Sequence, residues 1–150
     1  EINFKPQKYN RSLFDEIKLK IDLAYGRANF SKRLLISDDA IECQGNTNLL
    51  EEFPLLFFDC KVVSNNKKKF LKNFSVRTGS DEILNLNVKG NLNILNNKIN
   101  FKDISLNEKY LASKEDLSFF KNTFEKILLD KSFIDIFNMK KIKNFILEVS

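Results

Sequence analysis

The side chains that could act as acids, bases or metal ligands are carboxylates grouped in three adjacent pairs. Paired carboxylates supply the oxygen atoms that general acid–base catalysis or Ca²⁺ binding requires. The pairs are Asp38 and Asp39, Glu51 and Glu52, and Asp81 and Glu82. Adjacent residues of a strand point to opposite faces, and each pair lies at an expected turn. We therefore interpret these carboxylates as solvated turn residues.

The sequence contains no recognisable motif for nucleophilic or cofactor chemistry. Histidine is absent, which removes imidazole general bases and Cys/His zinc sites. No G-x-S-x-G elbow or supported S-x-x-K pair occurs, and the 4 glycines are too widely spaced for a phosphate-binding or dinucleotide-binding loop. We therefore predict a protein that is not an enzyme, with no catalytic residues, no metal site and no cofactor.

The basic residues raise the question of an anionic partner, because the formal net charge is +5. Most of this charge is lysine, and the lysines alternate with apolar residues instead of forming one stripe. We interpret the charge as a solvated surface and expect no nucleic-acid partner. Lys67, Lys68 and Lys69 beside Phe70 form either a headgroup contact or an exposed hairpin tip, and we favour the hairpin tip.

The two cysteines, Cys43 and Cys60, lie on neighbouring expected strands. In an oxidising compartment they can pair if their Cα atoms lie within about 7 Å of each other. In a reducing compartment they act as two small buried hydrophobic residues. Cys60 shares an apolar side with Leu56 and Phe58, which favours the second alternative, and the sequence leaves both open.

Alternating apolar and polar residues predict antiparallel strands along most of residues 17–106. Residues 17–23 alternate strictly, and the clearest signal is the stretch of residues 83–106. We expect a further strand at residues 70–76, after a polar hairpin connection at residues 64–69. Gly90 lies on the apolar side, where it permits a bend or the close approach of another backbone.

The residues after Phe101 break the alternation, since Ile99 and Phe101 have one parity and Ile104 and Leu106 the other. A change of parity inside one strand is typical of an extra residue on that strand. We therefore predict a β-bulge at Lys102 and Asp103.

Helical spacing replaces the alternation after Tyr110. Ser113 and Asp116 resemble a capping box, and the apolar residues that follow share one helix face. We expect a short second helix at residues 130–138 and a third at residues 139–149, with a closing strand at residues 145–149 as the alternative. The predicted fold class is mainly β with C-terminal helices (α+β), in which residues 1–112 form a curved antiparallel sheet or half-barrel and residues 113–150 cap it.

An antiparallel sheet with one apolar face must bury that face, and two or three short helices are too few to cover all the strands. The sheet then either packs on itself or keeps a groove for an acyl chain. The proposed groove residues are Ile17, Leu19, Ile21, Leu23, Leu84, Leu86, Val88, Leu92 and Ile94.

A family resemblance favours the groove. Three segments of the sequence resemble the C-terminal portion of AsmA-like proteins. They are LNLNVKGNLNI at residues 84–94, KINFKDISL at residues 98–106, and the ending at residues 133–137 and 141–146. These are related to TamB and to bridge-like lipid-transfer repeats. The resemblance covers roughly residues 17–149.

This resemblance implies the end segment of a longer protein, anchored by an upstream segment on the periplasmic face of the inner membrane of a bacterial cell envelope. It implies a non-enzymatic role in outer-membrane lipid homeostasis, with a phospholipid or other acyl-chain ligand and an envelope protein as a further candidate partner. The alternative is a self-packed structural or protein-interaction module that recruits a partner through an exposed edge strand.

Overall fold

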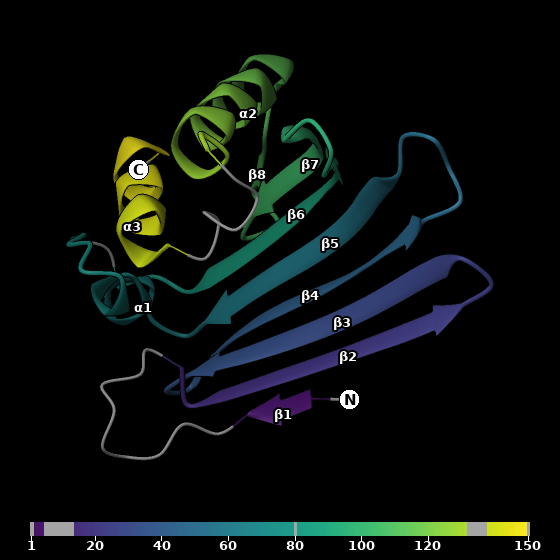
Figure 1. The fold of residues 1–150 in the computed structure, drawn as a ribbon. Helices are drawn as coiled ribbons and strands as arrows, with labels where there is room; N and C mark the ends of the chain where they lie inside the picture. The colour runs from purple at the N-terminus through teal and green to yellow at the C-terminus, as the bar shows by residue number, and fades with distance from the viewer. Residues whose placement is uncertain (1, 5–13, 80, 132–137, 150) are drawn as a thin grey trace.

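The computed structural model describes residues 2–4, 14–79, 81–131 and 138–149, and within these residues the strands form one antiparallel sheet. The strands follow one another in chain order, so each connection joins neighbours, and the sheet stays open (Figure 1). The predicted fold class, a curved antiparallel sheet with C-terminal helices, is confirmed. The strands are β1 (Ile2–Phe4), β2 (Glu16–Ala24), β3 (Arg27–Ile36), β4 (Asp39–Asn48), β5 (Leu55–Ser64), β6 (Leu84–Asn93), β7 (Lys98–Leu106) and β8 (Tyr110–Leu111).

The pairing register separates an apolar face from a polar face. Ile41 of β4 lies opposite Val62 of β5, which lies opposite Leu86 of β6, and this row defines the apolar face. One residue further along β4, Glu42 lies opposite Lys61, and this row defines the polar face. Because the register is continuous from β2 to β6, each of these strands contributes alternate residues to each face.

The helices pack on part of the apolar face (Figure 1). They are α1 (Lys67–Asn73), α2 (Lys114–Leu128) and α3 (Met139–Val149). One core cluster joins α1 and α3 to the adjacent ends of the strands, with Ile36 and Leu84 buried in it. A second cluster joins α2 to β5, β6 and β7 around Leu92, Ile99 and Phe101.

Helix α1 corrects the prediction of a hairpin connection at residues 64–69 and a strand at residues 70–76. The side chain of Asn66 accepts a hydrogen bond from the backbone N–H of Lys69 (2.8 Å) and caps the helix. Phe70 and Phe74 then lie one turn apart, with ring centroids separated by 5.3 Å. Their spacing of four residues fits both a strand face and a helix face, and the cap decides between them.

The C-terminal helices agree with the sequence pattern. Ser113 caps α2 through a complete capping box, in which its Oγ accepts from the backbone N–H of Asp116 (3.1 Å). Residues 139–149 form α3, so the closing strand considered for residues 145–149 is not formed. Most of the helix expected at residues 130–138 lies outside the described residues.

The predicted bulge in β7 is confirmed. Lys89 of β6 lies opposite Asp103, but the next residue, Gly90, lies opposite Phe101, so Lys102 is the extra residue. The expected close approach at Gly90 is also present. A Cβ atom at this position would lie 2.3 Å from the carbonyl oxygen of Asn100.

We predict that Gly90→Ala lowers the free energy of unfolding by about 1–3 kcal/mol, because the added methyl group must displace the backbone of β7. Gly79→Ala is the matched control, since a Cβ there meets nothing within 4 Å. Urea unfolding of both variants measures the difference. Equal stability of the two variants would show that the bulge does not depend on this close approach.

A second prediction concerns Asp116. The Tyr110 hydroxyl donates a hydrogen bond to its carboxylate (2.7 Å), and this bond, with those from Ser113, holds the pKa of Asp116 below its usual range. A lowered carboxyl pKa adds stability above the unfolded-state pKa, and this stability is lost as the pH falls through the folded-state pKa. Tyr110→Phe should therefore raise the pKa of Asp116 toward its ordinary value in an NMR titration. An unchanged pKa would contradict the role of the hydroxyl.

Candidate functional site

Part of the apolar face carries no helix. The residues of β2 and β3 that lie toward the β2–β3 turn belong to neither core cluster of the described residues. Ile21 is 49% exposed and Leu23 is 70% exposed, although both lie on the same face as the buried core. We define the open apolar surface as Leu19, Ile21, Leu23, Ala28 and Phe30.

The nine residues proposed for the groove fall into two groups in the structure. Four of them lie under the helices and either belong to a core cluster or pack against one, namely Leu84, Leu86, Val88 and Leu92. Those outside the clusters are Ile17, Leu19, Ile21, Leu23 and Ile94. The first group lies in the hydrophobic core or packs against it, although Leu86 and Val88 are half-buried, as Ile17 and Leu19 are. The exposed residues of the nine are Ile21, Leu23 and Ile94.

Lys32 is a cation on the apolar face. The register places it between Leu19 of β2 and Cys43 of β4, and its side chain is half-buried there. Burial lowers the pKa of its ammonium group, because a desolvated charge is disfavoured. The sequence held a signal for this residue, since Lys32 interrupts the apolar series of Phe30 and Leu34, but our sequence reasoning did not single it out.

A second polar group on this face is the hydroxyl of Thr47, which lies opposite Ala28. Thr47 is buried, and its Oγ1 has no hydrogen-bond partner among the described residues. Buried hydroxyl groups normally have a partner, and because this oxygen is enclosed by the protein, a ligand could reach it only after a rearrangement of the structure.

Cys43 and Cys60 lie directly opposite each other on β4 and β5, and the structure joins them in a disulfide with a Cα–Cα distance of 4.1 Å. The sequence alone left this question open. The bond lies on the apolar face, between the strands that the helices cover and the strands that they leave open. It therefore links β4, which neighbours the open apolar surface, covalently to β5.

The polar face is hollowed into a trough of about 750 Å³ that crosses the strands from β2 to β7. Its charges are largely compensated. Arg33 pairs with Glu42 (3.2 Å) and Lys89 with Asp59 (3.3 Å), and all four side chains are substantially solvated. Exposed pairs of this kind contribute little to stability, so the trough is a solvated surface of mixed charge.

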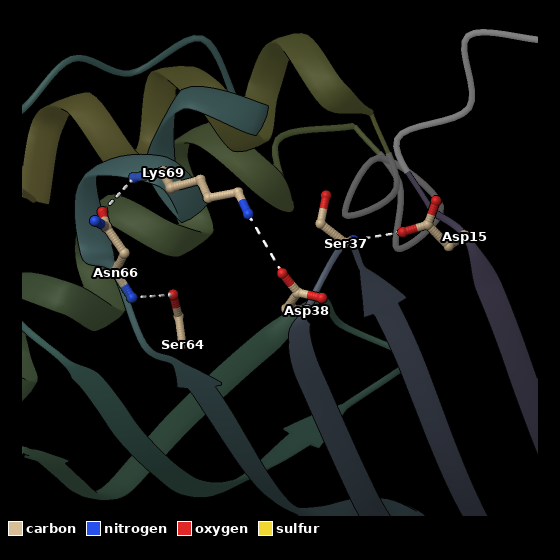
Figure 2. A network of polar contacts seen from close by, with 6 residues as sticks. All are labelled: Asp15, Ser37, Asp38, Ser64, Asn66 and Lys69. Atoms are coloured by element: carbon tan, nitrogen blue, oxygen red, sulfur yellow. Dashed lines mark hydrogen bonds and ion pairs between the residues drawn. The ribbon is translucent and has the colours of Figure 1, made fainter.

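The end of the sheet next to α1 is held by polar contacts (Figure 2). The ammonium group of Lys69 lies 3.4 Å from the Asp38 carboxylate, and the backbone N–H of Ser37 donates to the carboxylate of Asp15. Lys67, Lys68 and Lys69 thus form the first turn of a helix, not the hairpin tip that we favoured.

The acidic pairs differ in how far their side chains are exposed. Asp38 is exposed as expected, but its neighbour Asp39 is buried at the start of β4. Glu51 and Glu52 are both exposed in the β4–β5 connection. In the part of the chain that the structure describes, no three Cys, Asp or Glu side chains are grouped closely enough to hold a metal ion.

Comparisons with known proteins add no assignment. No protein-family model matches the chain, and neither curated proteins nor solved structures give a significant match. Among the described residues, no helix combines the length and apolar character needed to cross a membrane. The functional argument therefore rests on the residues and their arrangement.

We predict that breaking the disulfide destabilises the sheet. In the chain-entropy account a bridge across a sequence separation of 17 residues contributes about 3 kcal/mol. The double variant Cys43→Ala/Cys60→Ala should therefore lose about this amount in urea unfolding, and wild-type protein in reducing agent should lose a similar amount. A wild-type protein whose stability does not respond to reducing agent would show that the bond does not form in solution.

Proposed function

We propose that the protein is a non-enzymatic lipid-binding module in which the open apolar surface of β2 and β3 holds an acyl chain. The observation that supports this proposal is the uneven cover of one continuous apolar face. Helices bury it over β5, β6 and β7, and leave Ile21 and Leu23 exposed. Contiguous exposed apolar residues on a sheet face commonly mark an interaction or ligand-binding surface.

The dimensions of the surface suit an acyl chain. On β2 the open apolar surface runs from Leu19 to Leu23, which at about 3.3 Å per residue spans about 13 Å. One leaflet of a bilayer has a hydrocarbon thickness of roughly 15 Å, which is half of the core thickness. An extended chain lying along β2 would therefore contact the open apolar surface over most of its length.

The wider role follows from the family resemblance and is part of the proposal. We place the protein on the periplasmic face of the bacterial inner membrane, anchored by an upstream segment, where AsmA-like and TamB-like proteins contribute to outer-membrane lipid homeostasis. The disulfide between Cys43 and Cys60 supports an oxidising compartment such as the periplasm.

A second candidate function rests on the edge of the sheet. Strand β1 pairs only with residues 17–19 of β2, so among the described residues no strand covers the outer edge of residues 20–24. Such an edge can accept a strand from an envelope protein by β-augmentation. This role would use the backbone of β2, whereas lipid binding uses its side chains.

We predict that the double variant Ile21→Asn/Leu23→Asn folds normally but binds a fluorescent phosphatidylcholine at least about tenfold more weakly. Both side chains are exposed in the free protein, and each would bury enough apolar area on a lipid to contribute about 1–2 kcal/mol. Fluorescence titration with monomeric lipid measures the affinity, and circular dichroism checks the fold.

The matched control is Ser31→Asn, which introduces the same side chain at an exposed position on the polar face. It should bind lipid like the wild type. Equal lipid affinity of the double variant and the control, or wild-type protein that binds no lipid, would overturn the proposal and favour the edge-strand role.

A further inference from the structure

Three connections lie together at the end of the sheet opposite α1 (Figure 1). They are the β2–β3 turn at residues 25–26, the β4–β5 loop at residues 49–54 and the β6–β7 turn at residues 94–97. We call this region the loop end. Each connection carries large hydrophobic side chains that are exposed to solvent, namely Tyr25, Leu49, Leu50, Phe53, Ile94 and Leu95.

The first two connections form one continuous patch. The backbone N–H of Leu49 donates to the carbonyl oxygen of Gly26 (2.7 Å). The side chain of Leu50 lies over Gly26 so closely that a Cβ there would be 2.3 Å from its Cγ. Although Leu50 touches this turn, it is 77% exposed, so the contact leaves most of its apolar surface in water.

Tyr25 occupies a backbone position that is unfavourable for a bulky side chain. The turn has positive φ at both of its residues, 50° at Tyr25 and 75° at Gly26. Two-residue hairpin turns of this kind favour Asn followed by Gly, and a bulky side chain in the left-handed region is unfavourable. Tyr25 is also 97% exposed, so it gains no packing in return. Backbone strain without a packing benefit points to a role outside the fold.

Several backbone N–H groups of the loop end are hydrogen-bonded within the protein. The N–H of Leu50 donates to the side chain of Asn48 (3.2 Å), and the N–H groups of Leu95 and Asn96 donate to Asn93 (3.1 and 3.2 Å). A hydrocarbon medium offers no acceptor, so an unpaired N–H would oppose insertion strongly. These internal acceptors remove that penalty for the N–H groups of Leu50, Leu95 and Asn96.

We propose that the loop end inserts into the surface of a lipid bilayer. The hydrophobic side chains stand on turns that project from the end of the sheet, a shape that enters between lipids, and exposed aromatic residues such as Tyr25 and Phe53 favour the membrane interface. The loop end has no excess of positive charge that would favour an anionic membrane. Glu51 and Glu52 offset Arg27. The ammonium group of Lys98 pairs with Glu125 (3.0 Å). Zwitterionic phospholipid is therefore sufficient.

The loop end is distinct from the open apolar surface, but the two adjoin along β2. Leu23 on the open apolar surface is followed after one residue by Tyr25 at the tip. Insertion of the tip would bring the end of the open apolar surface to the bilayer. Docking nevertheless depends on its own residues and is separable from lipid binding.

Tryptophan is absent from the sequence, so Tyr25→Trp supplies a single fluorescent reporter at the tip. With vesicles of phosphatidylcholine we expect a blue shift of its emission, and with brominated acyl chains in the vesicles we expect quenching. The matched reporter is Ile83→Trp, an exposed position at the opposite end of the sheet, next to the start of β6. Its emission should not respond. Unchanged emission from the Tyr25→Trp reporter would overturn the proposal.

Tyr25→Asn tests the same proposal without a reporter, because Asn suits this turn and the variant should fold. We expect it to lose flotation with phosphatidylcholine vesicles, while Ile83→Asn floats like the wild type. Wild-type flotation by Tyr25→Asn would overturn the proposal. The proposal would also be overturned if sedimentation without vesicles showed a wild-type dimer that Tyr25→Asn disrupts, because the loop end would then contact a second copy. Monomeric-lipid affinity should be unchanged in Tyr25→Asn, which separates this test from the acyl-chain test.

Discussion

The structure depends on how one continuous apolar face of the sheet is covered. Alternation along the strands places every second residue on this face from β2 to β6, and the bulge in β7 carries the face on to that strand. Helices α2 and α3 are short, and together with α1 they bury the face over the later strands. The early strands remain solvated on both sides near the β2–β3 turn, where Ile21 and Leu23 are exposed. The proposed functions follow from this unequal cover.

Covalent and local interactions keep the uncovered strands attached to the covered ones. The disulfide between Cys43 and Cys60 joins β4 to β5 at the border of the core. The bulge at Lys102 keeps Phe101 and Ile104 on the apolar face although their parity differs, so β7 still presents a full apolar row to α2. The open part of the sheet is therefore an extension of a packed domain.

The two ends of the sheet differ in chemistry. Next to α1, charged side chains make the polar contacts of the turns: the carboxylate of Asp15 accepts a backbone hydrogen bond, and Asp38 pairs with Lys69 (Figure 2). At the loop end, asparagines satisfy the turn backbone and leucines and aromatic residues face outward. This difference, together with the open apolar surface beside the loop end, supports the proposal that the loop end faces a membrane and the end next to α1 faces water.

The sequence by itself determined the class of the elements, because alternation, the capping box at Ser113 and the parity break before Ile104 are local signals. It did not determine residues 70–76, where a spacing of four residues fits a strand and a helix equally and the Asn66 cap decides. It also did not determine which proposed groove residues are open. Leu92 and Leu23 have the same alternation, and only the packing of α2 buries one and leaves the other exposed. Burial depends on contacts between distant segments, which local periodicity does not encode.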